Sequence, residues 1–222
     1  MSADPALVWV FQVLMIGQLV AFGSIRGYYQ YKIKKINVNA VFGRRWNKGA
    51  GQEGKASVII QDLAGCIWGM GILVYAIWPP GMDWGALNLW LWIRWAGVGI
   101  GFTSLPLLIW VHRTLGRFWV PILDIMENHK LVTNGPYRRV RHPMYTLGFT
   151  FMLGTSLITD NWLNLLVTGL TLFIIYARIN QEEQMMFNHF GDEYRLYMRQ
   201  TGRLFPRIFW KRKRGTALIR LA

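Results

Sequence analysis

Long apolar stretches separated by short polar ones dominate the pattern of the chain. A helix needs about 20 apolar residues to cross the hydrocarbon core of a bilayer. Three stretches meet this requirement, and they run from Ala6 to Ser24, from Ser57 to Trp78 and from Leu87 to Val111. A fourth, from Met144 to Tyr176, is longer than one crossing and is interrupted by TDNW at residues 159–162. The pattern predicts an all-α integral membrane protein with five transmembrane helices, the last two forming a tight hairpin.

Composition agrees with membrane insertion. The 222 residues are 53% hydrophobic and include 12 Trp, which is more apolar surface than a soluble domain of this length needs. The amino-terminal sequence MSADPALVWV lacks the basic region and the cleavage site of a signal peptide, so we expect a retained first span. One cysteine, Cys66, excludes an internal disulfide, and no Cys/His cluster has zinc-ligand spacing, so no metal site is expected.

Basic residues alternate with the predicted spans. The chain has a net charge of +14, and nearly all its Lys and Arg residues lie in residues 26–55, in residues 112–143 and in the tail after Tyr176. The intervening loops, PPGMDWGA and TDNW, contain no Lys or Arg. The positive-inside rule then places the amino terminus outside, and both long loops and the carboxy-terminal tail in the cytoplasm. Because bilayer topology accounts for the charge, no nucleic-acid partner is expected.

Small residues recur four apart in two of the spans. Gly65 and Gly69 share one helix face, and so do Gly97 and Gly101. Such pairs allow the backbones of neighbouring membrane helices to approach closely. We therefore expect both pairs to mark helix–helix contacts.

Two charged residues fall inside predicted spans, where ionisable groups are often functional. Asp62 lies about 8 Å from the cytoplasmic start of the second span, and Arg94 about 10 Å from the outer end of the third. This difference in depth argues against a direct ion pair. We expect Arg94 to extend its side chain outward to the membrane surface, and Asp62 to border a cytoplasmic cavity.

A first dense polar block, ENHKLVTNGPYRRVRHPMY, precedes the fourth span. Asn134-Gly135-Pro136 is a turn signal, and Pro143 suits the first residue of the helix. The backbone N–H groups at this helix start, with Arg141 and His142 beside them, could bind an anion. A basic turn that contacts lipid phosphates, with its tyrosines in the interfacial aromatic belt, explains the same residues. The block alone does not distinguish these interpretations.

A second polar block runs from Tyr176 to Pro206. The helix of the fifth span is expected to continue to Phe190, where Gly191 offers a stop. Arg178 and Glu182 are four residues apart and therefore share a face, and His189 lies on a similar face. A surface ion pair would explain the spacing. A short loop, however, makes the last two spans antiparallel neighbours, so the start of the fourth should lie near Arg178. Because the two polar blocks would then meet, the arrangement favours a functional site over a surface ion pair.

These motifs resemble a known family of membrane enzymes. HKLVTNGPYRRVRHPMY, RINQEEQ and FGDEYRLYMRQTGRLFP occur in order, within residues 112–207, and together resemble the isoprenylcysteine carboxyl methyltransferase family. That family shares its carboxy-terminal pattern with membrane phospholipid N-methyltransferases. Residues 1–111 are then an amino-terminal three-span region and residues 112–222 the methyltransferase core, within one structural domain. The sequence departs from some family members at Ile122 and Leu123, where they have a Gln that contacts adenosine.

The resemblance implies methyl transfer from S-adenosylmethionine to a lipophilic acceptor that enters from the bilayer. The cytoplasmic cofactor pocket would be formed by the loop before the fourth span and by the carboxy-terminal helices. The residues that the resemblance assigns to the cofactor are His129, Lys130, Leu131, Val132, Tyr137, His142, Pro143, Met144, Tyr145 and Glu182. It assigns catalytic roles to Arg178, on the substrate side, and to Glu182.

The chemistry leaves the acceptor open. The cofactor carboxylate suits the helix start and its arginine, and its sulfonium or adenine suits a tyrosine ring. A carboxylate acceptor oriented by Arg178 needs no general base, whereas an amine needs one such as Glu182 or His189. An NADPH-dependent sterol-type reductase, which carries a similar RHP-x-Y stretch, and a non-enzymatic membrane protein that binds anionic lipids are the alternatives. Oligomeric state is not predicted.

Overall fold

A computed structural model describes residues 5–36, 55–116 and 130–207, and nearly all of the secondary structure in these residues is helical. The long helices are α1 (Pro5–Ile36), α3 (Lys55–Ile77), α4 (Leu91–Leu115), α5 (Pro143–Thr159), α6 (Trp162–Phe190) and α7 (Asp192–Gln200). Two short 3-10 helices, η3 (Pro79–Gly85) and η5 (Gly135–Arg138), lie in the connections. Three helices, α1, α4 and α6, are long and apolar enough to cross a membrane. The count of five spans stays a prediction.

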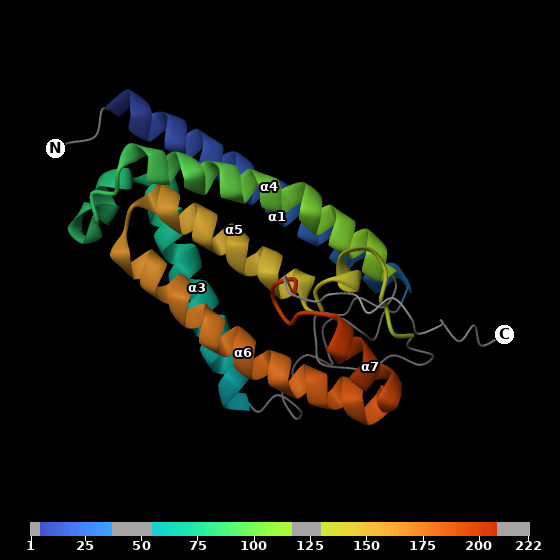
Figure 1. Ribbon diagram of the computed structural model, residues 1–222. Helices are drawn as coiled ribbons and strands as arrows, with labels where there is room; N and C mark the ends of the chain where they lie inside the picture. Colours follow the sequence, from blue (N-terminus) through green and yellow to red (C-terminus); the bar gives the residue numbers. More distant parts are fainter. Residues whose placement is uncertain (1–4, 37–54, 117–129, 208–222) are drawn as a thin grey trace.

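The helices form a bundle in which α5 lies between α4 and α6 (Figure 1). α1 packs on α4, and α3 packs on α6. Phe11, Met15, Tyr75 and Ile158 belong to a buried cluster that joins α1, α3 and α5. Many large apolar side chains point outward instead, among them Phe173, which is 76% exposed. A surface of this kind is stable only against lipid, so the chain is an integral membrane protein.

Two residues connect α5 to α6. Asp160 adopts a left-handed conformation with φ 53° and ends α5, and the Asn161 side chain accepts a hydrogen bond from the Leu163 N–H at 2.9 Å, which caps α6. The Asn161 amide also donates to the Met82 carbonyl at 2.8 Å. The polar interruption at residues 159–162 therefore caps a helix and fastens η3 to the α5–α6 turn.

Glycines bring α4 and α5 into close contact, as predicted for one of the two glycine pairs. A Cβ atom added to Gly97 would lie 2.6 Å from the Gly154 carbonyl oxygen, and one added to Gly154 would lie 2.8 Å from the Gly101 nitrogen. The prediction for Gly65 and Gly69 is wrong, because no described atom would lie within 4 Å of a Cβ there. On α3 the close approach occurs at Gly71, where the Asn164 side chain packs on the backbone.

We predict that Gly154→Ala lowers the free energy of unfolding by about 1–3 kcal/mol, because the added methyl group would meet backbone atoms that cannot rotate away. Gly148→Ala on the same helix is the matched control, since a Cβ at Gly148 meets nothing within 4 Å. Thermal unfolding of both purified variants tests the prediction. Equal melting temperatures for the two variants would contradict it.

Two helices differ from their predicted bounds. The first was expected to end at Ser24, but α1 continues to Ile36 because residues 24–36 contain no proline and only one glycine to stop it. The third was expected over 87–111, whereas α4 spans Leu91–Leu115. Leu87 and Leu89 donate their N–H groups to Asp160, at 2.9 Å in each case, and this contact keeps residues 87–90 out of the helix.

The expected position of the Arg94 side chain is also wrong. Arg94 is only 7% exposed and donates to the Ile158 carbonyl, at 2.9 Å from Nη2, and to the Tyr75 hydroxyl at 2.7 Å. Ile158 is in the last turn of α5, where carbonyl groups lack partners within the helix and the helix dipole favours a cation. Arg94 therefore caps α5 from inside the bundle. Asp62 is exposed, and its role stays a prediction.

Candidate functional site

The loop before α5 is held by the chain that follows α7. The Arg141 N–H donates to the Gly202 carbonyl at 2.9 Å and the His142 N–H to the Arg203 carbonyl at 3.1 Å. The Tyr197 hydroxyl donates to the Tyr137 carbonyl at 2.8 Å, which fixes α7 against η5. Because these contacts join segments about 60 residues apart, the polar block before α5 meets the second block on α6 and α7 at one end of the bundle (Figure 1).

The Tyr145 hydroxyl links the two residues predicted to be catalytic. Arg178 Nε donates to this hydroxyl at 2.8 Å, and the hydroxyl donates to Glu182 Oε2 at 2.9 Å. Tyr145 is in the first turn of α5, while Arg178 and Glu182 are one turn apart on α6, so the antiparallel pairing of these helices creates the arrangement. The structure thus brings together three of the predicted site residues.

His142 lies between the carboxylates of two consecutive glutamates. Its Nδ1 is 3.9 Å from Glu182 Oε1, and its Nε2 is 3.2 Å from Glu183 Oε1. The imidazole is 5% exposed and its ring centroid lies 5.8 Å from that of Tyr145. This position connects the Tyr145 cluster to a second cluster around Glu183, and it places a titratable group beside Glu182.

Glu183 anchors the second cluster, which sequence reasoning missed. Arg141 Nε donates to Glu183 Oε1 at 2.7 Å, and Arg203 Nη2 donates to Glu183 Oε2 at 2.6 Å. The hydrogen bonds that Arg203 donates to Glu183 raise the pKa of Arg203, so this guanidinium stays charged. Glu183 is 6% exposed, so its charge is stable only because cations surround it. The Glu182-Glu183 doublet was the available signal, but nothing in the sequence pairs it with Arg203.

Arg141 makes further hydrogen bonds within the protein. Besides Glu183, its Nη1 donates to the carbonyls of Met198 at 3.1 Å and Thr201 at 2.6 Å. Its Nε and Nη1 groups are therefore used within the protein, and its contact with a cofactor carboxylate stays a prediction. Arg138 and Arg139 on the adjacent turn are exposed, as expected for solvated or lipid-facing groups.

The remaining predicted residues lie around these clusters. Tyr137 is buried, and burial together with the nearby Glu182 carboxylate raises the pKa of its phenol, which stays protonated at neutral pH. Pro143 is the buried first residue of α5, and the Met144 sulfur accepts from Arg26 at 3.7 Å. Lys130 is exposed, and Leu131 and Val132 are partly buried. His129 lies outside the described residues, and His189 is exposed at the end of α6.

A pocket of about 630 Å³ opens between α6 and α7. Arg141, Glu183 and Arg203 line it, but none of the described residues predicted to hold the cofactor does. Among the residues that the structure describes, no group of three or more His, Cys, Asp or Glu side chains could hold a metal ion. The pocket is therefore a separate feature beside the Tyr145 cluster.

The bundle and the charged clusters at one end of α5 and α6 belong to a helical, integral membrane protein. The sequence matches the model of the phospholipid methyltransferase family over residues 92–193. The fold resembles a solved structure of the eukaryotic intramembrane Ras methyltransferase, an isoprenylcysteine carboxyl methyltransferase. That match has a TM-score of 0.54 and 21% identity, and covers 91% of this chain and 75% of the other.

Curated proteins are also similar to this chain in sequence. The protein-S-isoprenylcysteine O-methyltransferase of Schizosaccharomyces pombe is 36% identical over 83 residues, which are 37% of this chain and 35% of that protein. The nickel-cobalt-cadmium resistance protein NccN of Alcaligenes xylosoxydans xylosoxydans is 26% identical over 129 residues, 58% of each chain. The matches thus span less than two thirds of these relatives. They confirm the predicted resemblance to the isoprenylcysteine carboxyl methyltransferase family.

Proposed function

We propose that the protein transfers a methyl group from S-adenosylmethionine to the carboxylate of a lipophilic acceptor such as a prenylated cysteine. The observation that carries the proposal is the Tyr145 hydroxyl, which joins Arg178 and Glu182 within 2.8 and 2.9 Å. The curated relatives named as isoprenylcysteine O-methyltransferases support the acceptor class. The active site is proposed to face the cytoplasm, with the amino terminus outside, because the basic loops lie at that end.

Arg178 is proposed to hold the acceptor. A guanidinium can hydrogen-bond a carboxylate through two N–H groups, and Arg178 uses its Nε for Tyr145. The hydrogen bond to Tyr145 holds the guanidinium beside the start of α5. A carboxylate is already nucleophilic, so this reaction requires alignment of the nucleophile and no general base. A lipophilic chain on the acceptor would lie along the apolar surfaces of the helices, within the bilayer.

The residues around Tyr145 have the chemistry to hold the cofactor. When bound, S-adenosylmethionine supplies an electrophilic methyl group on a sulfonium. The Glu182 side chain is 30% exposed and has acceptor capacity for an ammonium or ribose hydroxyl. Tyr145 and Tyr137 offer aromatic faces beside this carboxylate. We propose that His129, Lys130, Leu131, Val132, Pro143 and Met144 complete the cofactor site, with His142 orienting Glu182.

A second candidate is methylation of a phospholipid amine, because the matching family model is that of the phospholipid methyltransferases. An ammonium must lose a proton before it can attack. Glu182 is placed to accept that proton, and His142, 3.9 Å from it, to receive it. A methyl-transfer screen against phosphatidylethanolamine and a farnesylcysteine analogue distinguishes the two acceptors.

Cofactor binding gives the first test. S-adenosylhomocysteine is expected to raise the melting temperature of the detergent-purified protein, because a ligand stabilises the folded state that it binds. Glu182→Gln should reduce this increase, and Tyr31→Phe, at an exposed position on α1, should not. Stabilisation by NADPH alone would instead support a reductase. If neither ligand stabilised the protein, the proposal would be wrong.

A further inference from the structure

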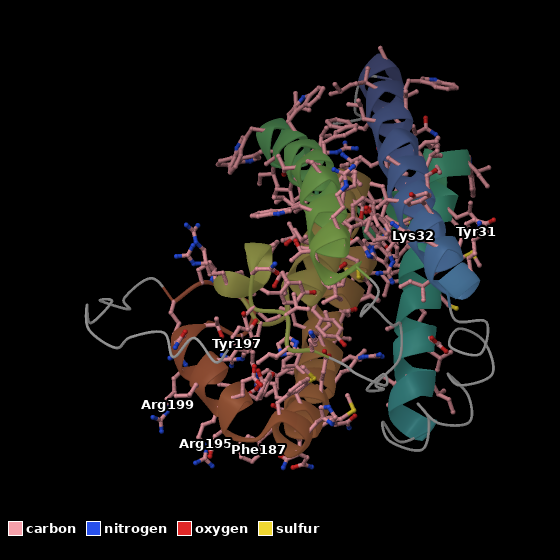
Figure 2. All side chains as sticks on the ribbon, turned by 90° about the vertical axis from the view of Figure 1, so that its right-hand side faces the viewer. Tyr31, Lys32, Phe187, Arg195, Tyr197 and Arg199 are labelled. Carbon is pink, nitrogen blue, oxygen red and sulfur yellow. The ribbon has the colours of Figure 1, made fainter. Side chains whose placement is uncertain are left out.

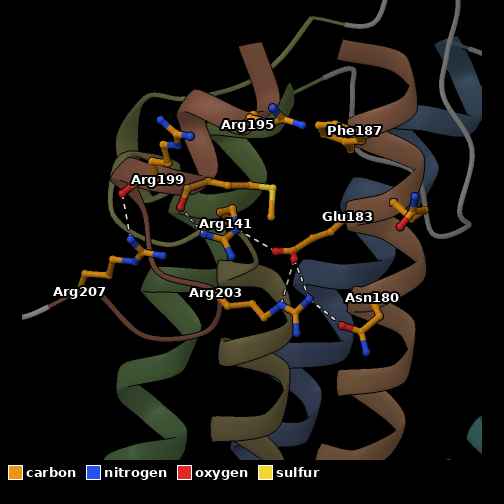
Figure 3. A pocket seen from close by; sticks show the side chains of 10 residues that line it. Arg141, Asn180, Glu183, Phe187, Arg195, Arg199, Arg203 and Arg207 are labelled. Carbon is orange, nitrogen blue, oxygen red and sulfur yellow. Dashed lines mark hydrogen bonds and ion pairs between the residues drawn. The ribbon is translucent and has the colours of Figure 1, made fainter. Parts of the chain in front are cut away.

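The pocket between α6 and α7 has an excess of positive charge. Five arginines line it, Arg141, Arg195, Arg199, Arg203 and Arg207, together with one carboxylate, that of Glu183 (Figure 3). They come from three places, the loop before α5, α7 and the chain after α7. Clustered like charges in a cavity repel one another and create a positive potential that attracts anions.

Glu183 neutralises only part of this charge. Its two oxygens accept from Arg141 and Arg203, at 2.7 and 2.6 Å, and Oε1 also lies 3.2 Å from His142 Nε2. Arg195 has only a long contact of 3.8 Å with the exposed Asp192. Within the described part of the chain, no carboxylate lies within salt-bridge distance of Arg199 or Arg207. Three of the five guanidiniums therefore lack a close carboxylate there.

The geometry of α7 makes this arrangement unfavourable without a ligand. Arg195 and Arg199 are four residues apart and therefore lie on one face, where like charges destabilise a helix. The opposite face buries Tyr194 and Tyr197, so the register of α7 is fixed and the two arginines stay together. Figure 2 shows both extending from the end of the molecule near Phe187. An anion between them would remove the repulsion.

The lining favours a phosphate-bearing ligand. Guanidinium groups match phosphate oxygens with two parallel hydrogen bonds, and several arginines can bind one phosphate. Phe187 and Met198 add apolar surface to the lining, and the Arg195 guanidinium lies 5.2 Å from the centroid of the Phe187 ring. The pocket is on the part of α6 beyond its apolar segment, where a bilayer surface would present phosphate headgroups.

We propose that the α6–α7 pocket binds a phosphate-bearing anion, either the headgroup of an anionic phospholipid or a soluble phosphate compound. The site is separate from the proposed methyl-transfer site, because Glu182, Tyr145 and Arg178 do not line the pocket. Arg195 and Arg199 are the primary ligands. Arg141 and Arg203 form the positively charged base of the pocket, which Glu183 holds in place.

Binding of two probes to the purified full chain in detergent micelles tests this proposal. One probe is phosphatidylglycerol, with phosphatidylcholine as its reference, and the other is inorganic pyrophosphate. At least one should bind saturably, and the double variant Arg195→Gln/Arg199→Gln should weaken that binding at least tenfold. Arg138→Gln/Arg139→Gln, which removes two exposed arginines outside the pocket, is the matched control and should change the affinity less than twofold.

The outcomes distinguish a lipid headgroup from a soluble phosphate, and specific binding from nonspecific attraction to basic residues. Binding of phosphatidylglycerol alone identifies a lipid site, and binding of pyrophosphate identifies a site for soluble phosphates as well. Equal weakening by both double variants would show nonspecific attraction to the basic surface and overturn the proposal, as would the absence of saturable binding. Competition by S-adenosylhomocysteine would also overturn it. Cofactor binding by the Arg195→Gln/Arg199→Gln variant reports separately on the proposed methyltransferase.

Discussion

Replacing Glu183 with glutamine is expected to lower the melting temperature of the protein by roughly 6–12 °C. Glutamine keeps the shape of the side chain but removes the charge that Arg141 and Arg203 contact at 2.7 and 2.6 Å. Breaking a buried ion pair by changing one partner costs about 3 kcal/mol, because the other partner is left without its counter-ion. Here two guanidiniums lose it. That of Arg141 also binds the Thr201 carbonyl, and that of Arg203 joins the chain after α7 to α6.

The neighbouring Glu182 provides the matched control. Its carboxylate accepts one hydrogen bond from the neutral Tyr145 hydroxyl and lies 3.9 Å from His142, so Glu182→Gln should cost about 1 kcal/mol. Thermal unfolding in detergent measures both variants. In the Glu183→Gln background, Arg203→Gln should cost much less than it does alone, because the two residues share one interaction. Equal stability losses in Glu182→Gln and Glu183→Gln would contradict the different roles assigned to them.

Tyr145→Phe is expected to lower the rate of methyl transfer by about 10–100-fold while leaving the fold intact. The substitution removes one oxygen, the atom that receives the Arg178 hydrogen bond and donates to Glu182. Without it, the guanidinium proposed to bind the acceptor and the carboxylate proposed to bind the cofactor are no longer held by one shared hydrogen-bonding group. Small errors in alignment have large effects on in-line displacement.

The loss should appear mainly in kcat, because the charged groups proposed to bind substrate and cofactor remain present. Far-UV circular dichroism and the melting temperature should stay close to those of the wild type. Tyr31→Phe removes the same atom from an exposed position on α1 and should retain full activity. Wild-type turnover by Tyr145→Phe would mean that the hydroxyl does not position the reacting groups.

The sequence was sufficient to predict the part of the site that depends on local connections. Two residues join α5 to α6, so any groups at the start of one helix and late in the other must be neighbours, and Tyr145 meets Arg178 and Glu182 for this reason. The stop at Gly191 was also predictable, since its φ of 56° is readily available to glycine.

The rest of the site depends on tertiary pairing that no local pattern encodes. Arg203 reaches Glu183 because the chain after α7 pairs with residues 139–142, across about 60 residues of sequence. The predicted position of the Arg94 side chain was wrong for a similar reason. Its depth in the membrane suggested extension to the surface, but its partner is the end of another helix, at Ile158. The hydrophobic periodicity of the sequence predicts the helices, whereas the contacts between helices determine which partner each charged side chain has.

Transfer of a labelled methyl group from S-adenosylmethionine tests the central claim most directly. Purified protein in lipid nanodiscs would be given the labelled cofactor and N-acetyl-S-farnesylcysteine, with Glu182→Gln measured in parallel. The product should be a methyl ester that releases labelled methanol in base, and Glu182→Gln should form at least tenfold less of it. If the wild-type protein formed no labelled product from this acceptor or from total membrane lipid, the assignment as a membrane methyltransferase would be contradicted.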